Sequence, residues 1–246
     1  MGKQARLDRI VLVHGAMHGA WCWEVLTPLL EQRGFEVSAL DLPGAGADRT
    51  PPKDVTLQSY IDRTVAVVNA GRAPVLLVGH SMGGMPISGA GEAIPDRIGK
   101  LLYLAAILPK NGETLFDGMG PRPEESAARA VRPSDIEGAS DFDRALAPKI
   151  FYNCCTPDVA ARAVQRLGAL PTEPLTASIA LTAERWGRIP KTYIVCARDQ
   201  GLPPARQHSL CDRAPEVKKL VMDTDHSPFY SDPVGLAEII EREARL

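Results

Sequence analysis

Apolar residues recur along the chain in short runs, separated by stretches whose apolar positions follow the helical period. The short runs predict strands at 9–14, 35–42, 74–80, 100–107, 191–197 and 217–222. Several runs are apolar at almost every position, which is typical of strands covered on both faces in a parallel sheet. The stretches between them predict helices at 21–33, 57–70, 83–94, 203–213 and 233–244. This alternation predicts an α/β fold with a mostly parallel, doubly wound sheet of about six strands.

The alternation stops between residues 108 and 188. This region has helical stretches around 141–150 and 157–168 but no convincing strand, and it is too long for a structureless loop in a compact domain. We therefore predict a single domain with an insertion. Residues 1–107 and 189–246 form the α/β core, and residues 108–188 form a mostly helical cap over the sheet.

Composition narrows the classes of partner. The net charge is −2 and no block of Lys or Arg stands out, so nucleic acid and anionic membranes are poor partners. The apolar run before His14 is too short for a signal-peptide core, and no window approaches a membrane span. The five cysteines lack CxxC spacing, which argues against a disulfide framework and a zinc site. Reduced thiols in the cytoplasm are the expected state.

One stretch suggests a nucleophile. "VLLVGHSMGG" matches G-x-S-x-G, with Gly79, Ser81 and Gly83 at the motif positions. The motif places a serine on a sharp strand-to-helix turn, where small neighbours let the chain pack closely and the hydroxyl projects above the sheet. A predicted strand precedes Ser81 and a predicted helix follows it. A glycine-rich turn without a catalytic role is the alternative. Pro86 conflicts with the predicted helix unless it lies in the first turn.

A serine nucleophile needs a base, and the base needs an orienting acid, in the chain order serine, acid, histidine on this kind of fold. Asp199 in "YIVCARDQG" and His226 in "LVMDTDHSPF" each follow a predicted strand. Both are therefore expected at carboxyl strand ends, where ligands bind in open α/β sheets. Asp223 and Asp225 are too close to His226 in sequence to be natural orienting acids, although they stay open as alternatives.

Two backbone N–H groups should stabilise the oxyanion. We predict that they belong to Met82, directly after the nucleophile, and to Ala16 in the turn "VHGAMHGAW". A glycine-rich turn before a helix is also found at phosphate sites, but neither GxGxxG nor GxxxxGK is present.

The opening "VLVHGAMHGAWCWEVLTPLLEQRGFEVSALDLPGAG" and the stretch "LTAERWGRIPKTYIVCARDQGLPPARQ" resemble the plant methylesterase and hydroxynitrile lyase group of the α/β-hydrolase superfamily. The resemblance runs from about residue 10 to 243 and is weakest over 115–150. It implies an α/β-hydrolase fold that needs no cofactor and no metal, and it allows a homodimer.

Two positions separate the lyases of this group from its esterases. The lyases carry a threonine where this chain has Gly15, and a lysine where it has Ser227. The resemblance therefore implies the esterase branch. The plant esterases usually have a methionine after the catalytic histidine, so the pocket near Phe229 is expected to differ.

We predict a serine carboxylesterase that hydrolyses a small-to-medium, hydrophobic or aromatic ester through an acyl-enzyme. The expected pocket lies between sheet and cap, lined by Met17, His18, Met85, Phe116, Phe151, Tyr152, Leu175, Trp186 and Phe229. A hydroxynitrile lyase and a non-catalytic ligand receptor on the same fold are the alternatives.

Overall fold

The main sheet is the centre of the protein. The computed structural model describes residues 6–120 and 126–245, and in these parts the main sheet has six strands, all paired in parallel. In sheet order they are β2 (Glu36–Leu40), β1 (Arg9–Val13), β3 (Val75–His80), β4 (Ile98–Leu104), β8 (Lys191–Cys196) and β9 (Lys218–Met222). Each strand overlaps one predicted from the sequence, so the predicted fold class is confirmed.

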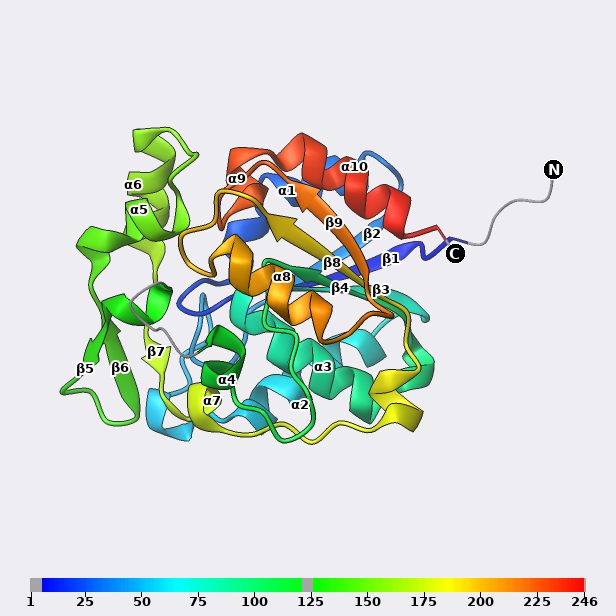
Figure 1. Ribbon diagram of the computed structural model, residues 1–246, viewed down its shortest axis with the longest axis horizontal. Helices are drawn as coiled ribbons and strands as arrows, with labels where there is room; N and C mark the ends of the chain where they lie inside the picture. Colours follow the sequence, from blue (N-terminus) through cyan, green and yellow to red (C-terminus); the bar gives the residue numbers. More distant parts are fainter. Residues whose placement is uncertain (1–5, 121–125, 246) are drawn as a thin grey trace.

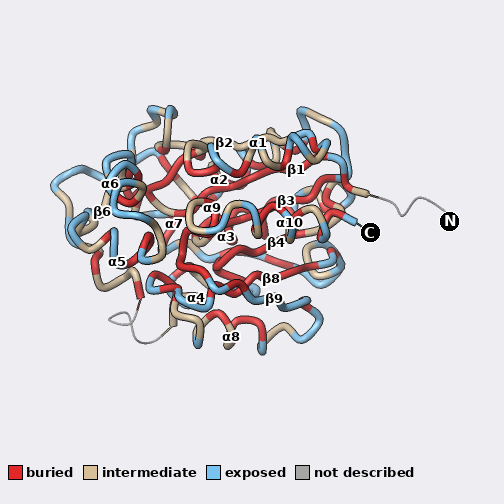
Figure 2. The backbone as a smooth tube through the Cα atoms, turned by 90° about the horizontal axis from the view of Figure 1, so that it is seen from above, coloured by how far each residue is buried: buried red, intermediate tan, exposed pale blue. Residues whose placement is uncertain are grey.

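Helices cover both faces of this sheet (Figure 1). One face carries α1 (Leu26–Glu31), α9 (Pro228–Ser231) and α10 (Pro233–Glu243); the other carries α2 (Leu57–Asn69), α3 (Gly84–Ala93) and α8 (Pro204–Asp212). Successive strand residues therefore enter different cores. Along β1, Val11 and Val13 belong to the core under α2 and α3, whereas Ile10 and Leu12 belong to the core under α1 and α10. Figure 2 shows the central strands buried between these layers.

The described residues also contain short 3-10 turns and one π turn. The 3-10 turns are Ala20–Trp23, Pro52–Asp54, Ser81–Gly83, Pro95–Arg97, Ala127–Ala130 and Arg144–Leu146, and a π turn spans Ala183–Gly187.

Residues 108–188, called here the intervening segment, connect β4 to β8. Their described part contains α4 (Leu115–Met119), α5 (Ala147–Phe151), α6 (Pro157–Arg166) and α7 (Glu173–Thr176). It also contains a small antiparallel sheet of β5 (Val131–Pro133), β6 (Ala139–Phe142) and β7 (Leu170–Pro171).

The expectation of no strand in the intervening segment was wrong. These strands are two to four residues long and two of them contain proline, so no alternating pattern develops for sequence reading to detect. The helix predicted around 141–150 begins only at Arg144 as a 3-10 turn, because residues 141 and 142 belong to β6. The helix predicted over 157–168 is present as α6. The boundaries of an inserted cap stay a prediction.

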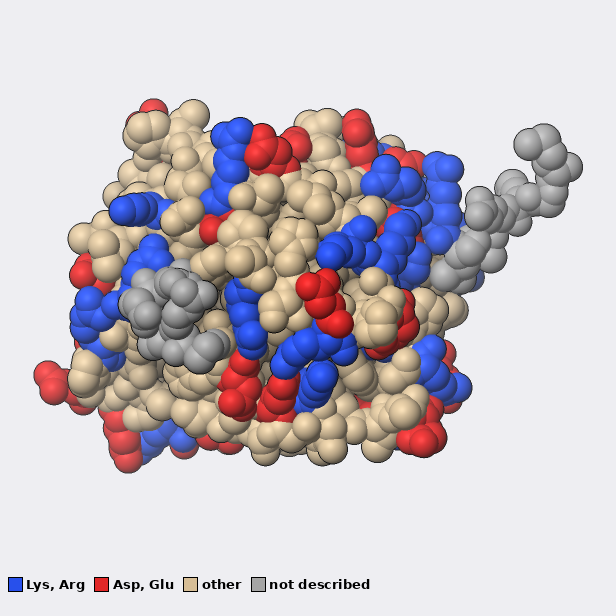
Figure 3. Space-filling model, in the orientation of Figure 1, with Lys and Arg blue, Asp and Glu red and all other residues tan. Residues whose placement is uncertain are grey.

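Part of the intervening segment lies at the opposite end of the main sheet from the chain ends. In Figure 1, β5, β6, α5 and α6 lie beyond the carboxyl ends of the strands, whereas Arg6 and Arg245 form an antiparallel bridge at the other end. On the face drawn in Figure 3, cationic and anionic side chains are interspersed without a large patch of one sign. None of the helices within residues 6–120 and 126–245 has the length and apolar run that a membrane crossing needs.

Candidate active site

Ser81 lies on a strained turn between β3 and α3. Its φ is +54°, a left-handed conformation that residues other than glycine rarely adopt and that is found at functional sites. The glycines of the motif permit the close packing around it. A Cβ at Gly79 would lie 2.6 Å from the Gly83 carbonyl oxygen, and a Cβ at Gly83 would lie 2.8 Å from the Val13 carbonyl oxygen. The turn therefore has the geometry expected of a nucleophile elbow.

Pro86 fits this turn without breaking the helix. It is the third residue of α3, which begins at Gly84 directly after the 3-10 turn Ser81–Gly83. The first N–H groups of a helix have no intrahelical acceptor, so a proline in the first turn removes no bond that the helix interior needs. The conflict seen in the sequence is thereby resolved.

The loops after β8 and β9 bring an acid to a histidine. Asp199 Oδ2 accepts a hydrogen bond from His226 Nδ1 at 2.7 Å, and both residues are buried. Asp199 Oδ1 accepts from the backbone N–H groups of Gly201 at 2.6 Å and Leu202 at 2.8 Å. These bonds hold the carboxylate in one orientation and fix the tautomer of His226, leaving its Nε2 for other chemistry.

The other two aspartates near His226 have different partners. Asp223 is exposed and forms an ion pair with Arg198. Asp225 is fully buried, but its oxygens accept from the Cys154 N–H at 2.7 Å, the Ser231 hydroxyl at 2.7 Å and the Ser227 N–H at 3.0 Å. Asp199 is therefore the carboxylate that contacts the imidazole.

Three further histidines surround the site, and none has a carboxylate partner in the described part of the chain. His14 Nδ1 donates to the Gly15 carbonyl at 2.8 Å, His18 Nδ1 donates to the Ala16 carbonyl at 2.9 Å, and His80 Nε2 donates to the His226 carbonyl at 2.8 Å. Burial lowers the pKa of all three imidazoles, that of His18 to about 3. All three stay neutral at neutral pH, and two of them, His18 and His80, line the pocket.

The turn after β1 lies directly against the nucleophile. The His18 N–H bonds back to the Gly15 carbonyl at 3.3 Å, and Met17 has a φ of +63°, as the third residue of a type II turn requires. A Cβ at Gly15 would lie 2.8 Å from the Cβ of Ser81. Ala16 and Met82, the predicted oxyanion-hole residues, both line the pocket that contains Ser81.

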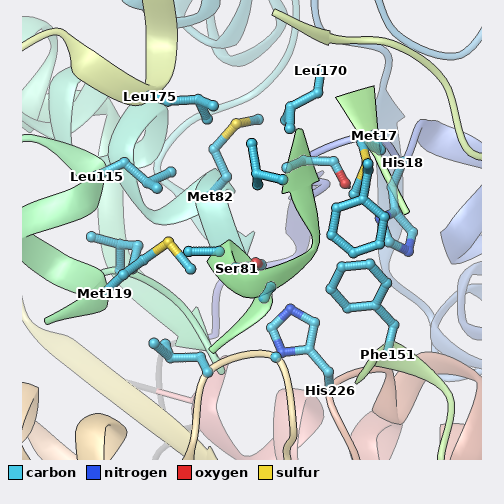
Figure 4. A pocket seen from close by; sticks show the side chains of 18 of the residues that line it. Met17, His18, Ser81, Met82, Leu115, Met119, Phe151, Leu170, Leu175 and His226 are labelled. Atoms are coloured by element: carbon cyan, nitrogen blue, oxygen red, sulfur yellow. The ribbon is translucent and has the colours of Figure 1, made fainter. Parts of the chain in front are cut away.

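That pocket has a volume of about 640 Å³ and a mostly apolar wall. Ser81 and His226 lie side by side in it, with Leu115 and Met119 on one flank and Phe151 on the other (Figure 4). Of the nine residues predicted to line the pocket, Met17, His18, Phe116, Phe151 and Leu175 do so.

The other four residues predicted to line the pocket are not part of its described wall. Met85 is fully buried in the core on the α2 and α3 side. Phe229 packs against Trp23 and His80 in the opposite core. Trp186 donates its indole N–H to the Tyr103 hydroxyl at 3.0 Å. Each of these side chains is apolar enough to line a pocket, but each packs against other residues of the protein interior instead.

Tyr152 is the fourth, and it supports the wall from behind. Its hydroxyl donates to His18 Nε2 at 2.8 Å, because the Nδ1 of that ring already carries the proton given to Ala16. His18 thus has both ring nitrogens satisfied, and its orientation in the wall depends on a residue of the intervening segment.

Sequence reasoning missed about half of the wall. The missed residues fall into two groups, those at carboxyl strand ends and those in the intervening segment: His80, Ile107, Gly201 and Leu202; and Leu115, Met119, Ala127, Ala128, Val131, Phe142 and Leu170. The first group was within reach, since residues that follow parallel strands meet at one edge. The second gave no signal, because its elements are too short to show a period.

A metal site is not formed in the described residues, where no group of three or more His, Cys, Asp or Glu side chains is arranged to hold an ion.

The comparisons with known proteins agree with this fold. The alpha/beta hydrolase family model matches residues 10–239, and the chain belongs to that family. Norfluorocurarine synthase 1 of Strychnos nux-vomica is 32% identical, covering 95% of this chain and 94% of its own. Methylesterase 1 of Arabidopsis thaliana is 30% identical, covering 97% and 96% respectively.

Solved structures give the same result. A pyrethroid hydrolase from Sphingobium faniae superimposes with a TM-score of 0.87 at 27% identity, covering 97% of both chains. The chain spans only 55% to 64% of three putative chloroplastic methylesterases of Arabidopsis thaliana. The resemblance to the methylesterase group noted in the sequence is confirmed.

Proposed function

We propose that the protein is a serine carboxylesterase that forms an acyl-enzyme on Ser81. The observation that carries the proposal is the convergence of three groups, two of them lining the pocket and the third behind the histidine. Ser81 is on a strained elbow, His226 lies beside it, and Asp199 holds the far nitrogen of His226 at 2.7 Å. Ester hydrolysis is also the activity in the names of relatives such as methylesterase 1 and the pyrethroid hydrolase.

In the first half-reaction Ser81 Oγ attacks the ester carbonyl carbon while His226 Nε2 takes the hydroxyl proton. The backbone N–H groups of Met82 and Ala16 stabilise the negative oxygen of the tetrahedral intermediate. When the intermediate collapses, His226 returns the proton to the departing alcohol and the acyl group stays on Ser81. In the second half-reaction His226 deprotonates a water, which attacks the acyl carbon and releases the acid.

The substrate that suits this pocket is uncharged and apolar on both sides of the ester bond. The polar side chains in the described wall are those of Ser81 and three histidines, and no charged Lys, Arg, Asp or Glu side chain is among them. A charged substituent would lose its hydration there without a partner. We propose that residues 108–188 act as the cap, because they supply most of the apolar wall opposite Ser81.

The two alternatives are less well supported. Gly15 and Ser227 stand where the resembling lyases carry threonine and lysine, so the groups that handle a cyanohydrin are missing. A passive receptor needs no acid–histidine pair, and burying Asp199 and His226 without a catalytic role would only destabilise the fold.

The test is ester hydrolysis by wild type and by Ser81→Ala on a panel of p-nitrophenyl esters. We expect kcat to fall by about five orders of magnitude or more in the variant, as happens when a serine nucleophile is removed. A fluorophosphonate should label the wild type once and leave Ser81→Ala unlabelled. Ser178→Ala, which changes an exposed serine outside this pocket, is the matched control. A Ser81→Ala variant that retained substantial turnover would refute the assignment.

Location and assembly remain predictions. All five cysteines are free thiols, which supports a reducing compartment such as the cytoplasm. A homodimer rests on the resemblance alone.

A further inference from the structure

We propose that Gln207 is a positioning residue that fixes the Asp199 carboxylate and, through it, the catalytic imidazole of His226. The inference rests on the proposed function, since it assigns a role within the same acid–base pair. Gln207 lies on α8, outside the motifs that carry the nucleophile, acid and base.

The Gln207 amide ties three parts of the acid loop together. It is fully buried. Its Oε1 accepts from the Cys196 N–H at 3.0 Å, at the end of β8. Its Nε2 donates to the Leu202 carbonyl at 2.6 Å and to Asp199 Oδ2 at 2.9 Å. One side chain therefore connects the last residue of the strand, the far side of the loop and the carboxylate between them.

Only a glutamine has the right set of groups at this length. The site requires two N–H donors and one acceptor, which the carboxamide supplies and an ionised carboxylate does not. A methionine fills a similar volume with no N–H at all. Because the site is buried, a donor or acceptor left without a partner destabilises the fold: it has lost its hydrogen bonds to water and gained none in the protein.

The contact with Asp199 involves the oxygen that the histidine uses. Asp199 Oδ2 accepts from Gln207 and from His226 Nδ1, while Oδ1 accepts from two backbone N–H groups of the same loop. Four donors thus hold the carboxylate plane. Without Gln207, Oδ2 retains one donor and the carboxylate gains freedom to rotate away from the imidazole. A rotated acid leaves the His226 tautomer and ring direction unfixed, which lowers the rate of proton transfer.

The charged and titratable groups that face the acid–histidine pair are few. His80 and His18 face the ring of His226, and Asp225 precedes it on the same loop. Burial lowers the pKa of both histidines, so they stay neutral. Asp225 is occupied by donors from Cys154 and Ser231.

Cys196 and Tyr193 face Asp199, and burial raises the pKa of each, so both stay neutral as well. His18, His80, Cys196 and Tyr193 therefore add no charge change of their own to the pH profile of kcat/KM near neutral pH.

The experiment compares Gln207→Glu and Gln207→Met with wild type in kcat/KM from pH 5 to 9, on a p-nitrophenyl ester. Two buried carboxyl groups in contact do not both ionise readily, so one of them holds a proton up to a higher pH, and that proton competes with His226 Nδ1 for Asp199 Oδ2. The pH at which kcat/KM reaches half its maximum should then rise by about one unit. Gln207→Met removes the donor to Oδ2 without adding charge. We expect the pH midpoint to fall, because a carboxylate that turns away stabilises the protonated imidazole less, and kcat to be about tenfold lower, because the hydrogen bond lost is one to a charged group.

Fluorophosphonate titration counts the folded active sites, and the midpoint of a pH profile does not depend on how many there are. A variant that merely unfolds part of the enzyme would lower the titre and leave the midpoint unchanged. The control is His208→Gln, which changes the residue next to Gln207 on α8 and lies outside the pocket wall. This variant should match wild type in the pH midpoint and in the titre. If Gln207→Glu and Gln207→Met both keep the wild-type midpoint and kcat per titrated site, the positioning role is wrong. Failure of the proposed function would show instead as an active Ser81→Ala enzyme.

Discussion

Two regions of the molecule build the pocket, and they contribute different chemistry. The edge of the main sheet, formed by the loops after β1, β3, β8 and β9, supplies the polar side chains: Ser81, His226 and the two neutral histidines of the wall. The intervening segment supplies only apolar side chains in its described part. The difference indicates a division of labour, in which the sheet edge determines the reaction and the intervening segment determines which esters fit.

The two regions also differ in how they are held. The loops of the sheet edge start from strands with continuous parallel neighbours. The intervening segment is joined to them by backbone hydrogen bonds, among them Gly168 N–H to the Met17 carbonyl and Ala127 N–H to the Gly201 carbonyl, both at 2.7 Å, and by side-chain bonds such as that of Tyr152 to His18. A change at the sheet edge should therefore act on kcat, and a change in the intervening segment should act mainly on KM.

The largest expected effect comes from a change at the sheet edge, at the acid that orients His226. Asp199→Asn keeps the shape of the acid but offers an amide N–H or a neutral oxygen to His226, which favours the wrong tautomer. We expect kcat to fall by about 10⁴-fold with KM nearly unchanged, as known for the equivalent change in a serine protease. Steady-state kinetics on one ester measures both constants. A fall of less than tenfold would mean that Asp199 is not the orienting acid.

The second effect lies at the junction of the two regions, where Tyr152 of the intervening segment binds His18. Burial lowers the pKa of His18 from 6.5 to about 3, so between these pH values the unfolded chain binds a proton that the folded chain does not. The free energy of unfolding must then decrease as the pH falls below 6.5.

Removing this histidine should remove its share of the acid sensitivity. Between pH 7 and 5 wild type should lose about 2 kcal/mol more than His18→Gln does, measured by urea unfolding at both pH values. His14 and His80 contribute equally in both proteins and cancel. Equal losses in the two proteins would mean that His18 is protonated in the folded state.

The smallest effect concerns the intervening segment alone. Phe116 on α4 lines the pocket and is also 39% exposed to solvent. Phe116→Ala should raise KM for aromatic esters by about fivefold, equivalent to about 1 kcal/mol of binding, with kcat for a small acetate ester unchanged. Val221→Ala, an exposed apolar residue of β9, is the control. A lower kcat on every ester would contradict the separation between the two regions.

The same comparison explains what could be predicted from the sequence. Strands such as β3 are buried at every position and apolar at almost all of them because both faces are covered, and such runs can be recognised without a structure. The prediction of Asp199 followed from its place after the fully buried β8, and that of His226 from its place after β9. Gln207 gave no comparable signal, since a glutamine within a helix is usually exposed and only the packing of α8 against the acid loop reveals its role.

The intervening segment was harder because its elements are short. β7 has two residues and α7 has four, which is too short for a repeated pattern that would distinguish a strand from a helix. Residues such as Phe142 and Leu170 enter the pocket because distant contacts position them, and a pattern along the chain does not report distant contacts. The prediction that Trp186 and Phe229 line the pocket was wrong for a related reason, since residue type alone does not say which way a large side chain points.

Gly15 limits the evolutionary routes open to this site. A side chain there would meet the Cβ of Ser81 at 2.8 Å and Nδ1 of His80 at 2.9 Å. The threonine found at this position in the resembling lyases cannot be added while Ser81 and His80 keep their present positions. A lineage moving from ester cleavage toward cyanohydrin chemistry would have to shift the Ser81 turn and the His80 ring before gaining that threonine, so the order in which mutations arise matters as much as their identity.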